Sequence, residues 1–436
     1  MRVLGAVLVG AVVVLLLALA VLWGLMVHRR PSEVQQLAGE PPLGQVTFTR
    51  AQPRAELPYD PAATRRRRTG GAAQTAAAAA AEEAALDRAF HLLSTLVKAA
   101  QARPQVTEGQ WLGQGRGIVL VVNEPFQQGT EALLVIHHLR EDLHCLLPIE
   151  LWHRNAGWPH EFTSLLAALD VTVRNLDQVA SLPQLHPLAL PALGLVHSQF
   201  QQVLLLDPSS LPLYDPTPLF DGLTPEAPAH FWSSPLPLGR QAACWRLLDD
   251  QQQQRLNYNW SQEGSLVLVD KQHCGKAVQL CAQIALQVGP AVQRLFPTEA
   301  DVWHFSWLAT GSVFRMRTVR PGSAGHRAAD GQFVGHTLVY EDERHQPFLL
   351  WPRWAPWSTA VTSTVPRWTE YQRFATAARG RWDAESHRLE DGPVERGSFA
   401  EVVDASVESQ CRQHLEPLRQ MPWYQARFAT ELQQLS

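Results

Sequence analysis

The stretch with most potential chemistry is a predicted strand that ends in a carboxylate. Val203 to Leu206 is a short apolar run, and Asp207, Pro208 and Ser209 follow it. An apolar run of this length predicts a buried strand, and open α/β sheets bind ligands at the carboxyl ends of their strands. Carboxylate oxygens are hard ligands for Mn²⁺ or Mg²⁺, and transferases that use sugar nucleotides place Asp-x-Asp at such a turn. Asp207 is therefore a candidate metal ligand, although an Asp that ends a strand before Pro is usually a turn residue.

A second Asp-Pro pair follows at Asp215.

The predicted elements that would position both carboxylates are strands and helices in alternation. Strands are predicted at 117–123, 147–151, 171–176 and 203–207, with helices between them at 130–141, 160–169 and 188–201. Short apolar runs alternating with helical stretches predict an α/β fold with a mainly parallel sheet.

The first 27 residues predict a membrane anchor. Val3 to Val27 carries no charge and, as a helix, spans roughly 37 Å, more than the ~30 Å hydrocarbon core of a bilayer. The run is long for a signal-peptide core, so an uncleaved signal anchor is the interpretation and a cleaved signal peptide is the alternative. Residues 28–110 form a predicted stem, with a Pro- and Arg-rich linker that includes Arg65 to Arg68, followed by an Ala-rich helix at 72–102.

Composition restricts the remaining function classes. The chain has 436 residues and a formal net charge of −4, which argues against a general nucleic-acid binder. The five Cys could form two disulfides and leave one thiol, or all could be buried thiols. Asn259 begins the single Asn-x-Ser/Thr sequon, a candidate glycosylation site. Residues 398–436 are predicted to be a helical appendage interrupted at Pro417 and Pro422.

Other side chains offer weaker candidates. His137 and His138 suggest a metal site, but adjacent residues on a helix point in different directions and ligate one ion poorly. Trp303 and Trp307 are four residues apart on a predicted helix, so core packing is the better interpretation. Three further tryptophans fall in an irregular Pro-containing segment and are candidates for stacking on sugar rings: Trp351, Trp354 and Trp357.

Several ordered blocks between Gly117 and Trp351 resemble a known family, the fungal-type Golgi α-mannosyltransferases (α-1,2 and α-1,3) that extend the outer chains of N-glycans. The matching blocks are 117–122, 138–152, 198–207, 215–221, 231–232, 262–271, 298–307 and 335–339. This resemblance implies a GT-A-like glycosyltransferase domain at 111–397 in a single-pass type II Golgi membrane protein, with the domain in the lumen. It also implies retaining transfer of mannose from GDP-mannose to a mannoside or glycoprotein glycan, with Mn²⁺ or Mg²⁺ bound.

The resemblance also assigns residues to the site. Asp207 matches the first acid of the metal motif, and Asp270 and Lys271 keep their family identities at the donor site. Ser209 replaces the second acid of Asp-x-Asp, so Glu299 and Asp301 are possible additional ligands.

The Asp-x-Asp metal motif is thus degenerate in this chain, where it reads Asp207-Pro208-Ser209. In addition, Pro191 stands where the family has a Lys. Two alternatives to a mannosyltransferase therefore remain open. One is a non-catalytic subunit that binds glycans or organises a complex, and the other is a transferase for a different nucleotide sugar.

Overall fold

The computed structural model describes residues 72–425, except 104–112, 124–126, 155–157, 180–188, 257–259, 289–290, 297, 299, 318, 329–330, 343, 345, 353–367, 375–380, 384–387, 391–393 and 405. The predicted span at 3–27 and the Arg65 to Arg68 run lie outside these residues. Within the described part, no helix combines the length and apolar character needed to cross a bilayer.

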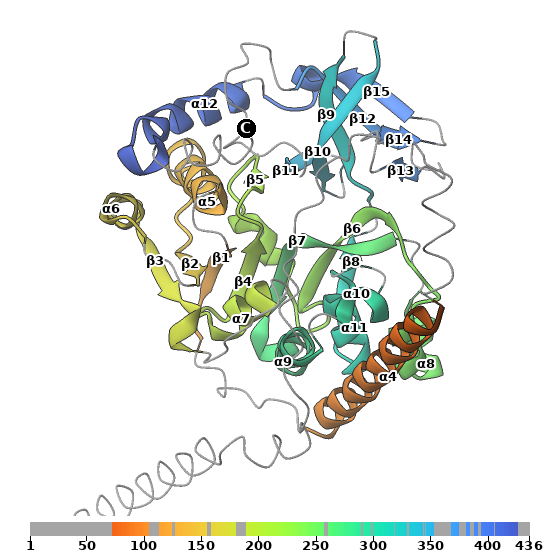
Figure 1. The fold of residues 1–436 in the computed structure, drawn as a ribbon. Helices are drawn as coiled ribbons and strands as arrows, with labels where there is room; N and C mark the ends of the chain where they lie inside the picture. Colours follow the sequence, from red (N-terminus) through yellow and green to blue (C-terminus); the bar gives the residue numbers. More distant parts are fainter. Residues whose placement is uncertain are drawn as a thin grey trace, which may run out of the picture. The chain divides into compact units, whose positions relative to one another are not determined.

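A seven-stranded mixed sheet forms the centre of the domain, in the order β3-β2-β1-β4-β7-β6-β8 (Figure 1). The first four of these strands are β3 (Val171–Asn175), β2 (Ile149–His153), β1 (Arg116–Val122) and β4 (Gln202–Leu206), and they run parallel. β7 (Trp260–Asp270) is antiparallel to both β4 and β6 (Ala229–Pro237), while β8 (Arg315–Arg317) is parallel to β6. The predicted α/β fold with a mainly parallel sheet is confirmed.

The apolar run of β1 is explained by two hydrophobic cores, one on each face of the sheet. Val119 and Val121 belong to the core that also contains α7 (Ala189–His197), α9 (Lys271–Gln287) and α11 (Asp301–Ala309). Ile118 and Leu120 belong to the other core, with α5 (Gln127–His137) and α6 (His160–Ala168). Because alternate residues of a strand face opposite sides, a strand buried on both faces is apolar throughout.

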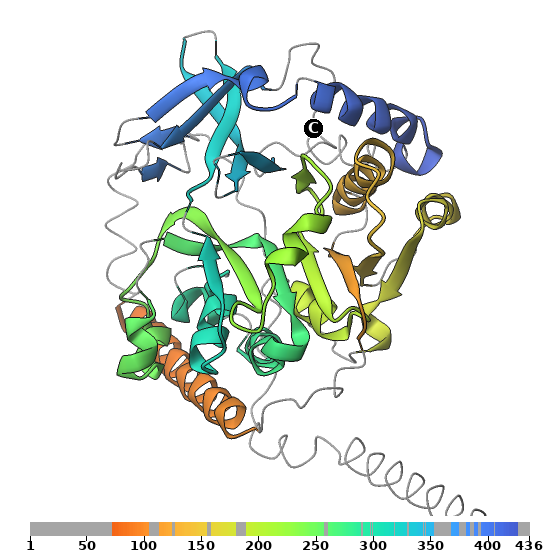
Figure 2. The ribbon, with the colours of Figure 1, turned by 180° about the vertical axis from the view of Figure 1, so that it is seen from behind.

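The Ala-rich helix α4 (Ala72–Ala102) has the predicted bounds and packs onto the domain. Leu93, Leu96 and Val97 are buried in the core of α7, α9 and α11. The Gln101 side-chain amide donates to the carbonyl of Ala309 at the end of α11, at 2.9 Å. Both ribbon views place α4 beside α8 (Asp250–Gln254) (Figures 1 and 2). The helix predicted as part of a stem is thus integrated into the fold.

A second sheet of six strands has the order β15-β12-β9-β10-β11-β5. Its members are β5 (Leu211–Pro212), β9 (Gly322–Arg327), β10 (Phe333–Glu341), β11 (Pro347–Trp351), β12 (Glu370–Phe374) and β15 (Val394–Ser398). β13 (Arg381–Asp383) and β14 (Arg388–Glu390) form a hairpin. The remaining described helices are η1 (a π-helix, His138–Asp142), η2 (Leu176–Gln178), η3 (Thr217–Gly222), η4 (Ala243–Leu247), α10 (Val292–Leu295), η7 (Phe399–Glu401) and α12 (Ser406–Arg419).

Three further expectations can be compared with the structure. All five cysteines are buried free thiols, as one of the two alternatives proposed. Trp303 and Trp307 lie in the core on α11, as predicted. The expected interruption at Pro417 is wrong, because α12 continues through this residue to Arg419.

Candidate functional site

A pocket of about 140 Å³ opens at the carboxyl ends of β1 and β4. Its lining combines the polar residues that follow these strands with parts of α7 and β7: Val121, Asn123, Gln128, Leu190, Pro191, Leu205, Leu206, Asp207, Pro208 and Gly264. The carboxylate predicted from the sequence therefore lies where an α/β sheet binds ligands. Pro191, which stands where the resembled family has a Lys, also lines this pocket.

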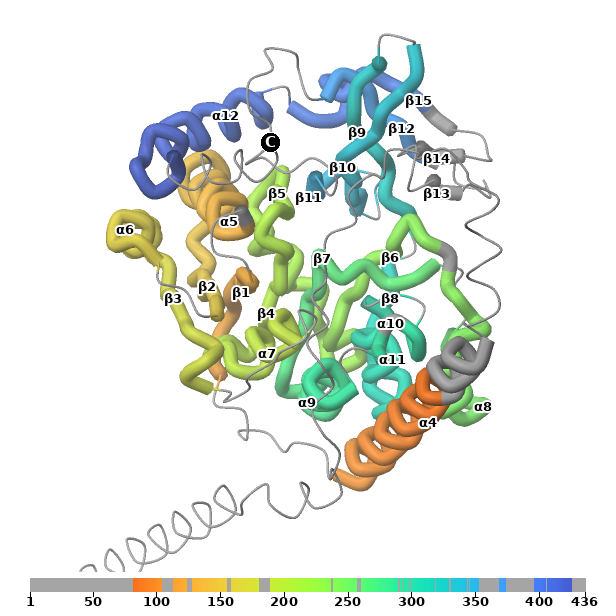
Figure 3. The backbone as a smooth tube through the Cα atoms, viewed as in Figure 1, coloured from red at the N-terminus to blue at the C-terminus, as the bar shows by residue number. Residues whose placement is uncertain are grey.

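The turn after β4 fixes the Asp207 side chain. Its Oδ1 accepts hydrogen bonds from the backbone N–H of Ser209 at 2.9 Å and from the Ser209 hydroxyl at 2.6 Å. The backbone N–H of Asp207 donates to the carbonyl of Ser265 on β7 at 2.8 Å. Since both side-chain bonds use Oδ1, Oδ2 is the oxygen that Asp207 offers to a ligand. The chain continues from this turn into β5 (Figure 3).

The neighbouring strand β7 contributes a buried acid that the sequence analysis missed. Glu263 precedes the pocket-lining Gly264, and its Oε1 accepts from the N–H groups of Gly264 and Ser265. Its Oε2 accepts the Tyr340 hydroxyl at 2.7 Å, and both side chains are buried. A carboxylate inside a predominantly apolar strand was the signal that could have identified it.

Asp270 and Lys271, predicted for the donor site, lie at the other end of the sheet. Asp270 pairs with Gln202 at the start of β4, whereas Asp207 follows the end of the same strand. The five residues of β4 therefore separate the two acids by about 17 Å. Asp270 caps α9 by accepting from the N–H of Gln272, and Lys271 is buried, with its Nζ donating to the carbonyl of Ser198 at 2.6 Å. Burial lowers the pKa of Lys271 to about 8. The structure does not bring this pair together with Asp207.

A larger pocket, of about 370 Å³, is located beside the start of α9. Gln272, His273 and Lys276 contribute to it, with residues from the loop after α11. Among the residues that the structure describes, no Asp or Glu lines it. Because metal-assisted diphosphate chemistry needs a carboxylate, the smaller pocket at Asp207 is the better candidate despite its size.

The possible additional metal ligands are not brought to Asp207 by any described contact. Asp301 is fully buried at the start of α11, where it accepts from the N–H and hydroxyl of Thr298 and from the N–H of Gln262. Burial raises the pKa of Asp301 to about 6. These bonds give Asp301 a structural role, and Glu299 lies outside the described residues.

Of the three tryptophans and the sequon asparagine predicted as site residues, the structure describes only Trp351. Trp351 is half-buried at the end of β11, where it pairs with Leu338 and packs against the core that contains α5 and α6. Trp354, Trp357 and Asn259 lie outside the described residues.

One known protein family is similar in sequence to part of this chain. Residues 115–223 match the model of a family described as "Mannosyltransferase putative". This segment contains β1, β4 and the Asp207 turn. No curated protein matches the chain in sequence.

Solved glycosyltransferase structures show distant similarity. Mouse xyloside xylosyltransferase 1 is 11% identical, with a TM-score of 0.32, 46% of this chain covered and 84% of that chain. The galactosyltransferase LgtC is 16% identical, with a TM-score of 0.28, 45% of this chain covered and 72% of that chain. The glycosyltransferase GlyE of Streptococcus pneumoniae is 11% identical, with a TM-score of 0.32, 47% of this chain covered and 45% of that chain. On the family match, residues 115–223 of this α/β chain are mannosyltransferase-like.

Proposed function

We propose that the chain is a membrane-anchored Golgi glycosyltransferase that transfers mannose from GDP-mannose to a mannoside or glycoprotein glycan. The observation that carries the proposal is the Asp207 pocket, because it lies at the carboxyl ends of β1 and β4 inside the segment that matches the mannosyltransferase family. The membrane anchor is the apolar run at 3–27, and the lumenal orientation follows from the family resemblance.

The residues present fit a divalent cation held with the help of the donor. Mg²⁺-type sites use one or two carboxylates and complete the coordination with substrate phosphates and water. Asp207 offers Oδ2, while the Ser209 hydroxyl stands beside Oδ1. When bound, Mn²⁺ or Mg²⁺ would neutralise charge on the leaving diphosphate. The amide side chains of Asn123 and Gln128 give the same pocket neutral hydrogen-bonding groups for a nucleotide sugar.

The proposed transfer exchanges one bond at the anomeric carbon of the donor. The bond from this carbon to the diphosphate oxygen breaks and GDP leaves with the bonding electron pair; a bond to an acceptor hydroxyl oxygen forms, and the proton of that hydroxyl passes to the leaving diphosphate or to water. The family resemblance supports retention of configuration. The pocket itself, with a small volume and an ordered Asp207 turn, supports binding of the sugar diphosphate end of the donor.

One observation favours a second candidate function. Asp207 is the single carboxylate among the described residues that line its pocket, and Ser209 stands where the second acid of Asp-x-Asp would be. One negative charge binds a divalent cation more weakly than two, so the same fold could serve as a non-catalytic glycan-binding or complex-organising subunit. Pro191 lines the same pocket in place of a Lys, and this difference could alter donor recognition. The third alternative is therefore a transferase that uses another nucleotide sugar.

A donor screen separates these functions. The full-length chain, purified in detergent, is incubated with Mn²⁺, a mannoside acceptor and one of several nucleotide sugars, and release of the nucleoside diphosphate is measured. We expect GDP release from GDP-mannose by wild type, and loss of it in Asp207→Ala. Asp215→Ala is the matched control, because Asp215 stands in the same Asp-Pro sequence outside the pocket lining.

Each of the other results identifies an alternative. Release of the nucleoside diphosphate from a different nucleotide sugar, and not from GDP-mannose, would show that the chain transfers another sugar. No donor binding by calorimetry, with or without Mn²⁺, combined with glycan binding that survives Asp207→Ala, would establish the non-catalytic function.

A further inference from the structure

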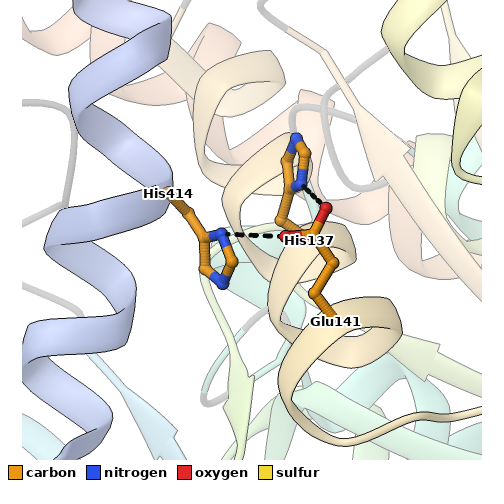
Figure 4. Close-up of side chains that lie close together, drawn as sticks. All are labelled: His137, Glu141 and His414. Atoms are coloured by element: carbon orange, nitrogen blue, oxygen red, sulfur yellow. Dashed lines mark hydrogen bonds and ion pairs between the residues drawn. The ribbon is translucent and has the colours of Figure 1, made fainter.

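Three histidines and two carboxylates meet where the C-terminal helix α12 packs against α5 and η1. His137 and Glu141 are four residues apart, and the His137 Nδ1 lies 2.9 Å from the Glu141 Oε1. His414 comes from α12, and its Nδ1 lies 3.4 Å from the Glu141 Oε2 (Figure 4). His137, which the sequence suggested as a co-ligand of His138, pairs instead with Glu141 on the next turn.

The distances resemble those between the ligands of a zinc ion. Zn²⁺ binds imidazole nitrogen and carboxylate oxygen at about 2.0–2.2 Å with tetrahedral geometry, which places neighbouring ligand atoms about 3.3 Å apart. The glutamate oxygens already lie 2.9 Å and 3.4 Å from the two histidine nitrogens. One ligand atom from each of the three side chains lies within 4.8 Å of the other two. A small approach of the two stacked rings, now 5.4 Å apart between centroids, would complete the arrangement.

A second carboxylate orients His414 for ligation. The His414 Nε2 lies 2.8 Å from the Asp142 Oδ2, and since an ionised carboxylate only accepts, Nε2 is the donor in this contact and Nδ1 is the nitrogen that faces Glu141. Zinc-binding histidines commonly donate their other ring nitrogen to a carboxylate in this way. Asp142 is itself held by the buried His138, whose Nδ1 lies 2.7 Å away and whose Nε2 contacts the carbonyl of Pro212 at 2.9 Å.

Burial and ligand type favour zinc over a hard cation. The side chains of His137 and His414 are 17% and 10% exposed, whereas Glu141 is 50% exposed. The two imidazoles are therefore largely shielded, and the Glu141 carboxylate is the solvent-facing member of the cluster. Nitrogen ligands suit Zn²⁺, while Mn²⁺ and Mg²⁺ prefer sites made of oxygen.

We propose that His137, Glu141 and His414 form a zinc site that links α12 to α5 and η1. This site is separate from the proposed cation position at Asp207, and it does not depend on the proposed function. Its ligands come from residues 137–141 and from residue 414, so the ion would cross-link two distant parts of the chain.

Metal binding tests the proposal directly. The full-length chain is freed of metal with a chelator and titrated with Zn²⁺, and bound metal is counted by elemental analysis. Co²⁺ is used as a second probe because tetrahedral cobalt gives a visible absorption spectrum. We expect one Zn²⁺ in this site, an affinity at least about 100-fold lower in His414→Gln, and about 10-fold lower in Asp142→Asn. The matched control is His160→Gln on α6, an exposed histidine that contacts Ser164, and its affinity should equal that of wild type.

A purely structural cluster gives different results. If His414→Gln fails to fold, Glu141→Gln replaces it, because Glu141 is half exposed and its loss removes a ligand with little change in packing. Wild type that binds no Zn²⁺, or that binds it as tightly as Glu141→Gln, would overturn the proposal. So would a Co²⁺ complex whose spectrum is unchanged in Glu141→Gln.

Discussion

Asp207 and Asp215 stand in two turns with the same local chemistry. Each precedes a proline, and each accepts two hydrogen bonds at Oδ1 from the residue two positions later. That residue is Ser209 in the first turn and Thr217 in the second. The bonds to the hydroxyls are 2.6 Å and 2.7 Å long.

Their surroundings differ. The Asp207 turn follows β4 and lines the pocket with the end of β1. The Asp215 turn follows β5 and precedes η3, and its carboxylate lies next to the buried thiol of Cys145, where it adds to the effect of burial in raising the pKa of this thiol to about 11. The comparison shows that an Asp-Pro turn becomes a candidate site through the strand that delivers it, since the turn itself is a stable local structure in either place.

The largest difference is expected in activity. Asp207→Asn removes the negative charge at the pocket and should lower the transfer rate by about 100-fold to 1,000-fold, the range found when one precisely placed stabilising group is lost. Asp215→Asn should stay within about twofold of wild type. Initial rates at saturating Mn²⁺ measure both, and equal losses in the two variants would refute the distinction between the turns.

Asp301 is a third carboxylate that accepts a hydrogen bond from a hydroxyl, that of Thr298, and unlike Asp207 and Asp215 it is fully buried. Burial raises the pKa of Asp301 to about 6, above its ordinary value of 3.8. Between these two pH values the folded state keeps a proton that the unfolded state has released, so stability falls as the pH rises from about 4 to 6, by roughly 2–3 kcal/mol. Urea unfolding at several pH values should show this decline in wild type and a flatter profile in Asp301→Asn. An unchanged slope in the variant would show that another group is responsible.

The free energy of unfolding should not distinguish the two half-buried turns. Asp207→Ala and Asp215→Ala each remove one acceptor for an N–H and one for a hydroxyl, and each should cost about 1–2 kcal/mol of unfolding free energy. Chemical denaturation of both variants measures this cost. A cost for Asp207→Ala much above that for Asp215→Ala would show that Asp207 holds the fold together and would weaken its assignment to the site.

The smallest effect is expected from adding charge. Ser209→Asp restores the second acid of Asp-x-Asp at the pocket and should raise Mn²⁺ affinity roughly tenfold, because ligand charge is a main determinant of cation affinity. Thr217→Asp adds the same charge at the other turn and should leave the affinity unchanged. Calorimetric titration with Mn²⁺ compares the two, and a gain in Thr217→Asp would indicate that charge alone is responsible.

The sequence allowed the four parallel strands and the helices between them to be predicted, because β1 and β4 are continuous apolar runs and the strand segments alternate with helical stretches along the chain. Asp207 was placed correctly by the same reasoning, as the residue that ends β4. Asp270 was assigned to the donor site through the family resemblance alone; because β7 is antiparallel to β4, the structure pairs it with Gln202 at the start of β4, away from Asp207. The partnership of Asp142 and His414 was also invisible, since 272 residues separate them.

The helix α4 has a consequence for synthesis of the chain. Its apolar side packs into the core that also contains α7, α9 and α11, and the hydrogen bond between Gln101 and Ala309 joins residues 208 positions apart. At about 5–20 residues per second, the ribosome needs some tens of seconds to produce the partner after α4 has emerged. During this interval Leu93, Leu96 and Val97 lack the part of their native core that α9 and α11 supply, so the apolar side of α4 stays incompletely covered until α11 has been made.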